Sequence, residues 1–525
     1  MNPPNAELAI SDSAAEIAAP LPRGARVGAG MGAGPAARGG RRGRIPTPEL
    51  LRARVYAYAR AAVRSRRLLA RSATAEHAAA VRDSARALIS SRALVWAAVC
   101  AAVLASGYGP LRHAFNPPHT TQGFGWLGDL LAAPAARWDS SWYLVIAHYG
   151  YRPDLGHFTA ARDAFFPLYP LGIRVLAAAG IPAVLGGVAI SLAALALALY
   201  GIHRLTVLEL VRARHRALSG ARAREVAQLG VLLTAFGPMA FFLSAVYSEA
   251  LYLALSIGVF YAARTGRFAV ASLLGALAAA TRSAGLLLLL PVLILYLYGP
   301  REDRAPDFVR AAPRALALTR GVAPARTLLA ALAPRYRVRR DALWIALFPA
   351  GLVLFMGYLA LGGGDPLAPL HAQQDWGRQF VGPLAGIWDA TSAAFEGARQ
   401  LLSLQTHHAY LPLAPKNSPA IAASHNLVDF AFLLAAVPAL AGVLRRLPFA
   451  YFAYVLAALA LALSYPIVIE PLMSLPRFLL VLFPLTIAVA LWLSEHPRAR
   501  MPALAFSAAL MAVSAAQFAT WHWVA

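Results

Sequence analysis

Long apolar runs alternate with arginine-rich stretches through most of the chain. A helix needs about 20 consecutive apolar residues to cross the hydrocarbon core of a bilayer. Runs near this length predict an all-α, polytopic membrane protein with about eleven transmembrane helices. The predicted helices cover residues 93–108, 184–203, 227–244, 247–264, 268–281, 284–298, 342–361, 427–445, 449–468, 477–493 and 502–521.

One further apolar segment, at about 166–180, is too short to cross a bilayer in the same way. It contains Pro167, Pro170 and Arg174, two helix breakers and a charge. Polar or irregular backbone at membrane depth must be buried in protein or line a cavity. We therefore expect this segment to be re-entrant or to lie flat on the membrane.

The positive charge of the chain lies between the apolar runs. The net charge is +24 although only 14% of the residues are charged and 59% are hydrophobic. Cytoplasmic loops carry such an excess of arginine, which places 204–224, 301–340, 445–446 and 498–500 inside, with the N-terminus inside and the C-terminus outside. Because the charge follows this membrane pattern, we exclude a nucleic-acid-binding protein.

The N-terminal part has a different composition. Residues 1–45 are rich in Gly, Ala, Pro and Arg and predict a disordered cytoplasmic tail. Residues 46–92 are rich in Ala, Leu and Arg at helical spacing, which predicts a basic helix that either lies on anionic lipid headgroups or is solvated. No cleavable signal peptide precedes residues 93–108, so we interpret that run as an uncleaved signal anchor.

These boundaries divide the chain into a tail, a basic helix and one transmembrane domain, 93–525. The domain has outer loops at 109–183 and 362–426 and a basic cytoplasmic loop at 299–341. Its single cysteine, Cys100, lies in an apolar run. An intramolecular disulfide and a zinc site built on thiolates are therefore excluded.

An aromatic stretch after the first predicted helix carries a lone carboxylate. Asp139 lies between Trp138 and Trp142 in Arg137–Tyr143, and a second aromatic stretch follows at 164–170. Trp and Tyr favour the boundary between hydrocarbon and water. Partial desolvation there would make Asp139 a better proton acceptor. An interfacial aromatic girdle with a solvated aspartate is the alternative interpretation.

The predicted topology places several polar residues on the same, extracytoplasmic, face or just below it. Ionisable residues at the edge of membrane helices are costly and often mark functional sites. Their convergence favours a site over separate structural roles. They are Asp139, Asp163, Glu249, Arg282, Asp365, Gln374, His425, Glu470 and Arg477.

Several motifs in chain order resemble the PIG-V family, the GPI mannosyltransferase II family with its bacterial relatives. The first comprises Trp138-Asp139-Ser140 with Trp142-Tyr143, Gly150-Tyr151 and Ala164–Pro170. Further blocks are Gly237-Pro238 with Tyr247-Ser248-Glu249, Thr281–Gly285, Gly364–Leu367 with His371-Ala372-Gln373 and Trp376, and Pro476-Arg477-Phe478. The resemblance spans about residues 93–495. The arginine-rich N-terminus and the 301–340 loop depart from it.

The resemblance implies a glycosyltransferase of the GT-C type, a helix bundle in the plasma membrane whose active site faces away from the cytoplasm. Such enzymes use a polyprenyl-phosphate sugar, here polyprenyl-phosphate mannose, and invert the anomeric centre. Because a phosphate leaves without a general acid, one carboxylate base suffices, and Asp139 is the candidate. Arg282 and Arg477 are suited to the donor phosphate, since guanidinium binds phosphate oxygens in a fork.

The remaining candidates are assigned to binding of the sugar or the acceptor. They are Trp138, Trp142, Tyr143, Asp163, Tyr247, Glu249, Asp365, Gln374 and His425. Asp163 and Glu249 are also the candidates for a divalent metal ion, although no ligand cluster has the spacing of a defined site. His407-His408 is interpreted as a surface pair.

Two alternatives stay open. A transporter or lipid flippase would carry charges near the membrane midplane and an alternating-access repeat, whereas here the charges lie at one interface. Within the enzyme class, nothing in the residues excludes arabinose or galactose as the transferred sugar. The acceptor is expected to be an envelope glycolipid, glycan or protein.

Overall fold

The structure is a computed structural model, and it describes residues 48–107, 125–151, 162–212, 217–308, 333–403 and 419–524. Only the backbone is described at 48–73 and 419–422. The predicted tail at 1–45, the middle of the basic loop at 309–332 and His407-His408 lie outside the described residues. The chain divides into two units, Met1–Arg71 and Ser72–Ala525, and the candidate membrane helices lie in the second.

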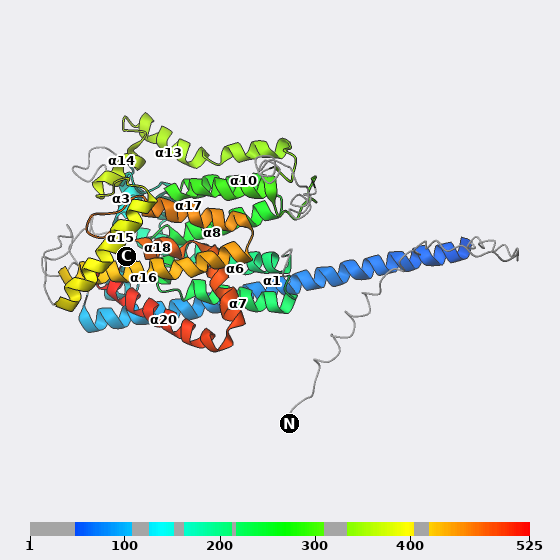
Figure 1. Cartoon of the computed structure of the whole chain (residues 1–525), viewed down its shortest axis with the longest axis horizontal. Helices are drawn as coiled ribbons and strands as arrows, with labels where there is room; N and C mark the ends of the chain where they lie inside the picture. Colours follow the sequence, from blue (N-terminus) through cyan, green and yellow to red (C-terminus); the bar gives the residue numbers. More distant parts are fainter. Residues whose placement is uncertain are drawn as a thin grey trace, which may run out of the picture. The chain divides into compact units, whose positions relative to one another are not determined.

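The prediction of an all-α protein is confirmed for the described part of the chain (Figure 1). Its strand-like pairing there is limited to an isolated bridge between Arg378 and Ile467. The α-helices are α1 (Pro48–Ser106), α2 (Gly125–Leu131), α3 (Ser140–Tyr149), α5 (Leu168–Ala178), α6 (Ala183–Val211), α7 (Gly220–Ala235), α8 (Glu249–Arg264), α9 (Phe268–Ala279), α10 (Leu289–Tyr298), α13 (Ala350–Leu361), α14 (Ala368–Asp375), α15 (Pro383–Ser403), α16 (Pro419–Arg446), α17 (Phe449–Leu463), α18 (Leu475–Leu480), α19 (Phe483–Glu495) and α20 (Pro497–Ala519). Short 3-10 helices are η2 (Ala133–Ala135), η4 (Ala240–Leu243), η5 (Ser283–Leu288) and η6 (Arg340–Leu347).

Several of these helices are long and apolar enough to cross a membrane. Four pass by length and hydropathy, at Thr74–Ser106, Ala183–Val211, Ala423–Arg446 and Pro497–Ala519. The pair η6 and α13, bent by 40°, passes as a fifth. The chain is therefore a multi-pass membrane protein. Five further segments are apolar helices of 10–17 residues, among them α5. The count of about eleven crossings and the sidedness of the chain stay predictions.

Helix boundaries differ from the predicted ones in several places; the predicted helix 477–493, for example, is divided into α18 and α19. Two of the differences have a clear cause. The predicted 227–244 helix ends at Ala235, because Pro238 disfavours helical geometry at Gly237 and removes a backbone donor. The predicted boundary at 92/93 falls inside α1, which contains no breaker there. Arg92 is buried and its guanidinium donates to the carbonyl oxygens of Ala235 and Ala240, at 2.8 Å each. It thereby satisfies acceptors that the end of α7 leaves open.

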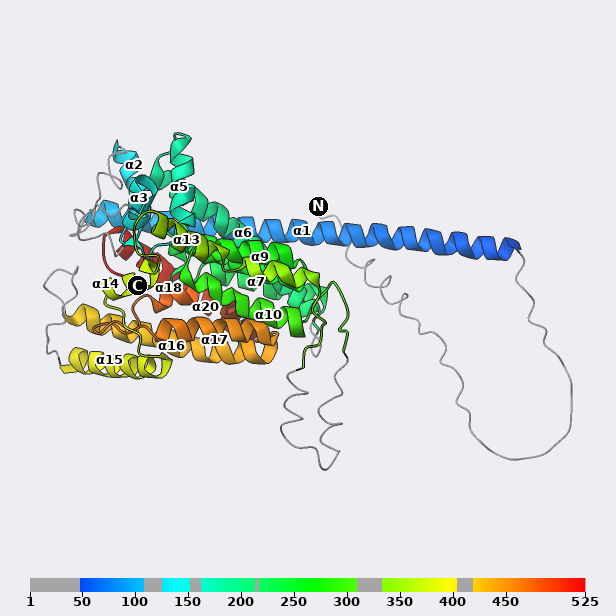
Figure 2. The same ribbon diagram turned by 90° about the horizontal axis from the view of Figure 1, so that it is seen from above.

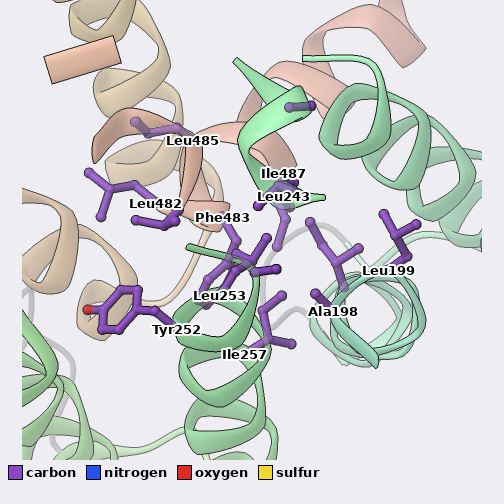
Figure 3. Close-up of a cluster of buried hydrophobic side chains, with 14 of the residues drawn as sticks. Ala198, Leu199, Leu243, Tyr252, Leu253, Ile257, Leu482, Phe483, Leu485 and Ile487 are labelled. Carbon is purple, nitrogen blue, oxygen red and sulfur yellow. The ribbon is translucent and has the colours of Figure 1, made fainter. Parts of the chain in front are cut away.

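The core lies where α6, α8 and α19 meet around η4. Ala198 and Leu199 from α6, Leu253 and Ile257 from α8 and Phe483 from α19 pack together in Figure 3. Burial of such side chains holds the helices in register. The segment from Phe236 to Ser248, which carries no α-helix, crosses this core and delivers Tyr247 and Glu249 to one end of the bundle.

Arginines of the predicted cytoplasmic stretches lie at the other end of the bundle. Helix α8 has Glu249 at its first turn and Arg264 at its last, about 24 Å apart for 16 residues. Arg264 pairs with Glu209 at the end of α6 at 2.5 Å, and Glu209 also accepts the hydroxyl of Tyr451 at 2.8 Å. Arg264 therefore lies at the opposite end of α8 from Glu249, and the assignment of that end to the cytoplasm stays a prediction.

Candidate active site

Four charged side chains form a continuous chain of ion pairs at one end of the bundle. Arg477 Nη1 lies 2.6 Å from Asp139 Oδ2, and Arg477 Nε lies 3.4 Å from Glu249 Oε1. Arg282 Nη1 lies 2.7 Å from the same Glu249 oxygen. Two cations and two anions thus balance in a buried environment, where unpaired charge would be costly.

Each of these residues lies at or beside a helix terminus. Asp139 precedes α3, but its carboxylate makes no capping bond and turns to Arg477 instead. Glu249 begins α8, Arg282 precedes η5 and Arg477 is in α18. Helix ends carry unpaired backbone groups and interrupted packing, so polar side chains gather there.

Aromatic rings surround the two guanidinium groups. Arg477 lies over the rings of Tyr247, Phe242 and Phe478, at 5.5, 5.6 and 5.8 Å from their centroids. Arg282 lies 5.5 Å from the centroid of Phe478. Ser474, whose left-handed backbone (φ 71°) opens the turn into α18, accepts from Arg477 Nη2 at 3.2 Å. These contacts fix the position of Arg477 from several directions.

Tyr247 holds the backbone of Asp139. Its buried hydroxyl accepts the Asp139 N–H at 3.1 Å and donates to the Arg137 carbonyl oxygen at 3.2 Å. The neighbouring hydroxyls of Tyr143 and Ser248 share a hydrogen bond of 2.8 Å. Of the two predicted sugar-binding tyrosines, Tyr247 therefore fixes the turn before α3, and Tyr143 joins α3 to Ser248.

Trp138 is tied to the C-terminal residues of the chain. Its ring makes edge contacts with Trp521 and Trp523, with centroids 5.7 and 5.2 Å apart, and its Nε1–H donates to the His522 carbonyl at 3.2 Å. Its backbone is left-handed (φ 55°), a strained conformation for a bulky residue. The strain accompanies the sharp turn that presents Asp139.

A second group of aromatic rings lies near the charge cluster, and Asp163 is close to it in the sequence. Trp142 stacks on Phe165, and Trp376, which follows α14, contacts both rings with centroids 5.8 Å apart. Asp163 is half-buried, and one of its oxygens, Oδ1, has no hydrogen-bond partner. Burial raises the pKa of Asp163 to about 6, although Arg162 opposes the shift.

Asp365 and Gln374 lie apart from the charge cluster, on the surface around α14. Asp365 Oδ2 lies 2.5 Å from Nδ1 of His371, and Asp365 Oδ1 accepts the Leu367 N–H at 2.8 Å. These contacts hold the pKa of Asp365 below its ordinary value. Gln374 is exposed. In both views α14 lies at the same end of the bundle as α3, the helix that Asp139 precedes (Figures 1 and 2).

His425 belongs to a separate buried group with Glu470. His425 Nδ1 lies 3.9 Å from Glu470 Oε2, and Asp429 lies near the same carboxyl. Burial raises the pKa of Glu470 to about 7, and a positive charge on Arg378 opposes the shift. Two buried carboxyl groups side by side share protons as a pair.

The donor set does not fit a metal ion at Glu249. Its Oε1 already faces two guanidinium groups, whose charge would repel a cation. The charges of Asp365 and Asp375 act on the carboxyl group of Asp163. Even so, the part of the chain that the structure describes holds no group of three His, Cys, Asp or Glu placed to bind a metal ion.

Sequence reasoning missed Arg378. Its guanidinium is buried, donates to the carbonyl oxygens of Tyr465 and Met473 at 3.0 and 3.1 Å, and lies within electrostatic reach of Asp139 and Arg477. Burial lowers the pKa of Arg378 to about 10, with the charge of Arg477 as the next cause. Its place in the sequence, two positions after Trp376 in a predicted outer loop, was the signal that could have identified Arg378 as a site residue.

Comparison with known proteins bears on the first part of this site. Residues 110–295 match the family model described as Mannosyltransferase (PIG-V). No curated protein and no solved structure matches the chain. The resemblance to this family is confirmed over residues 110–295, and with it the enzyme class, a glycosyltransferase of the mannosyltransferase type. Asp139, Glu249 and Arg282 fall within that range, whereas Arg477 lies beyond it.

Proposed function

We propose that this PIG-V-type mannosyltransferase transfers mannose from polyprenyl-phosphate mannose to a hydroxyl group of an envelope glycolipid, glycan or protein, with inversion at the anomeric carbon. The proposal rests on one observation, the chain of ion pairs at this end of the bundle. The Asp139 carboxylate contacts the Arg477 guanidinium, and Glu249 links Arg477 to a second guanidinium, that of Arg282. A base and a site for a leaving phosphate are the two parts that this chemistry needs.

The reaction follows from these groups. Asp139 takes the proton of the acceptor hydroxyl while the hydroxyl oxygen forms its bond to the anomeric carbon. The bond from that carbon to the phosphate oxygen breaks, and the lipid phosphate leaves with the electron pair. Arg282 and Arg477 stabilise the anion that forms, so no acid has to protonate it.

The contacts of Arg477 add a condition. Its Nη1 is engaged by Asp139 and its Nη2 by Ser474, so a donor phosphate that uses the fork of Arg477 displaces Asp139. Displacement exchanges one anion for another at the guanidinium and leaves the Asp139 carboxylate facing the sugar. Donor binding thereby releases the base, which suppresses proton abstraction in the absence of donor.

The surrounding side chains serve binding. Trp138, Trp142 and Tyr143 line the aromatic side of the centre, and apolar sugar faces stack on such rings. Tyr247 and Glu249 hold the machinery in place, and Asp163, Asp365, Gln374 and His425 bind more distant hydroxyl groups of sugar or acceptor. The end of the bundle that carries the charge cluster lies on the extracytoplasmic side of the plasma membrane, because the arginine-rich loops at the other end favour the cytoplasm. The basic stretch that precedes the candidate span at Thr74–Ser106 contacts anionic lipid headgroups.

A reconstitution experiment tests the proposal. The purified protein in liposomes receives polyprenyl-phosphate mannose, arabinose or galactose in separate reactions, with an envelope extract as acceptor. We expect transfer of mannose only, with inverted configuration in the product by NMR. Transfer of arabinose or galactose in place of mannose contradicts the assigned donor, and release of product from Asp139→Asn at the rate of the unchanged protein contradicts the assigned base.

A further inference from the structure

A cavity of about 450 Å³ lies beside the candidate active site, between α15 and the loops that bring Arg378 and Arg477 to that site. Helix α15 contributes Asp389, Ser392, Ala393 and Glu396, which recur at the three- and four-residue spacing of one helix face. The opposite wall consists of Pro466, Ile467, Val468 and Pro471, with Gly377, Gln379 and Val381 at the side. Its volume is within the roughly 300–1,000 Å³ of small-molecule sites.

Helix α15 has two chemically different faces. Leu384, Trp388, Phe395 and Leu402 are exposed and recur at helical spacing along another strip of the helix surface, beside the cavity-lining residues. A helix with one apolar and one polar face is suited to the membrane interface, with its polar face turned to water. Asp389, Ser392 and Glu396 therefore present polar groups to a ligand in the cavity, while the opposite wall is apolar.

The wall formed by α15 is held firmly. Gly386 packs against the carbonyl oxygen of Leu463 at the end of α17, and Gly397 packs against the backbone of Ala423 in α16. Both positions exclude a larger side chain. In both views α15 lies along the first turns of α16 (Figures 1 and 2). The cavity is thus built into the fold between elements that are fixed to one another.

The cavity and the charge cluster share their walls. Gly377 and Gln379 line the cavity, whereas Arg378 between them turns its guanidinium toward the carbonyl of Met473, next to the Ser474 that contacts Arg477. The bridge between Arg378 and Ile467 joins the two loops. A ligand in the cavity is therefore separated from Asp139 and Arg477 by a single layer of chain.

We propose that this cavity binds a neutral, hydroxylated saccharide portion of the acceptor, a role that rests on the proposed function. Carboxylates accept hydrogen bonds from sugar hydroxyls, and Ile467 with the two prolines offers an apolar surface to the C–H face of a sugar ring. Glu396 is paired with Arg399 at 2.9 Å, and the described residues that line the cavity include no Lys or Arg. A donor phosphate therefore finds no cation in the cavity wall, so donor and acceptor are sorted between the arginine cluster and the cavity.

A matched pair of substitutions on α15 tests the proposal. Ala393→Trp fills the cavity, whereas Ala398→Trp places the same bulk at a half-buried position of the same helix that does not line the cavity. The probes are the methyl α-glycosides of mannose, mannobiose and mannotriose, whose binding to the purified full chain is measured by saturation-transfer NMR. We expect the trisaccharide to bind the unchanged protein and Ala398→Trp alike, and Ala393→Trp at least tenfold more weakly. The double variant Asp389→Asn/Glu396→Gln should show a similar loss without added bulk.

The outcomes separate this proposal from the proposed function. Equal binding by Ala393→Trp and Ala398→Trp, or no binding of any probe to the unchanged protein, overturns the cavity assignment while mannose transfer from the lipid donor can still be observed. Probe binding that Ala393→Trp abolishes supports the cavity even where the reconstituted enzyme transfers no mannose, a result that overturns the proposed function alone.

Discussion

Arg477 and Asp139, 338 positions apart in the sequence, are joined by a 2.6 Å contact between Nη1 and Oδ2 at the end of the bundle. Both side chains are largely buried, at 10% and 14% exposure. The contact connects the segment before α3, within the family match, to α18, far beyond it. The candidate base and a candidate phosphate ligand therefore act as one unit, and their roles have to be separated by substitution.

Asp139→Asn should retain the fold and lose turnover. The amide keeps the size of the side chain and can still contact Arg477, but it cannot take the proton of the acceptor hydroxyl. We expect kcat to fall by roughly 10²–10⁴-fold, the usual contribution of general base catalysis. Turnover is measured per folded protein, by radiolabelled mannose transfer after size-exclusion chromatography.

Asp307→Asn, at the predicted cytoplasmic end, is the matched control and should keep full turnover. A structural role of Asp139 makes the opposite prediction: poor expression or a lowered Tm, with normal turnover of the molecules that fold. That result would move the base to Asp163 or Glu249.

Tyr247→Phe should damage the position of Asp139 without touching its carboxylate. The substitution leaves the Asp139 N–H and the Arg137 carbonyl oxygen without their buried partner. An unsatisfied buried group costs about 1–3 kcal/mol, so Tm should fall and kcat should decrease while the KM for donor stays unchanged. Thermal unfolding and steady-state kinetics of one preparation check both parts, and a variant with unchanged Tm and kcat argues against this positioning role.

Substitutions of the two arginines should differ in severity. Arg282→Ala and Arg477→Ala both weaken donor binding, by about 1.5–3 kcal/mol for each lost charge-assisted contact, and Arg→Lys restores only part. Arg477→Ala should also destabilise the protein more, because it leaves both Asp139 and Glu249 without this partner. Donor affinity and Tm are measured together.

The double variant Arg477→Ala/Asp139→Asn provides the internal check on that pair. Removing both charges should recover part of the stability lost in Arg477→Ala but none of the activity. Arg267→Ala, an exposed arginine at the other end, serves as control. Full donor affinity in both alanine variants would place the phosphate elsewhere.

The sequence was informative about this cluster because its members are rare polar residues at the ends of apolar runs. Asp139, Glu249, Arg282 and Arg477 could be assigned to one face from the alternation of helices and arginine-rich loops alone. Their pairing could not, since a contact across 338 residues depends on how the helices pack. The same limit applies to Asp365, Gln374 and His425, which share the end of the bundle but do not reach its centre.

Residues hidden within apolar stretches were harder to identify. Asp429 lies in a predicted membrane helix and gave no signal of its pairing with Glu470, and the break at Gly237-Pro238 falls inside a helix predicted to run through residue 244. At Gly237-Pro238 the proline was a local signal that the surrounding apolar residues outweighed, and Arg92 binds carbonyl oxygens on both sides of the break. The surroundings of Asp429 depend on tertiary contacts with the 464–474 loop.

The sidedness of the membrane can be tested at two exposed positions in a Cys100→Ser background. Val338→Cys lies in the predicted cytoplasmic loop and Asp365→Cys in the predicted outer loop. A membrane-impermeant maleimide should label Asp365→Cys in intact cells and Val338→Cys only after permeabilisation. Labelling of Val338→Cys from outside would reverse the orientation. Ser140, fully buried, is unsuited to this experiment.

Glu470 should make stability depend on pH. Its pKa is raised to about 7 by burial, beside Asp429, His425 and Trp523, with Arg378 as the nearest cation. Between about 4.3, the ordinary pKa of a glutamate, and 7 the folded protein keeps a proton that the unfolded chain releases. By linkage the stability contributed by this group is fully present below that window and is lost as pH rises through it. We expect Tm in detergent to fall between about pH 4 and 7 and to level off above that range.

Two variants decide whether Glu470 is the group responsible. Glu470→Gln, neutral at every pH, should show a flatter profile of Tm against pH than the unchanged protein. Asp365→Asn, whose native carboxyl has a lowered pKa and lies on the surface, should keep the slope of the unchanged protein. Asp163, whose pKa is also raised, contributes equally to the unchanged protein and to Glu470→Gln. Parallel profiles for these two proteins would therefore show that the buried pair carries no proton in this window.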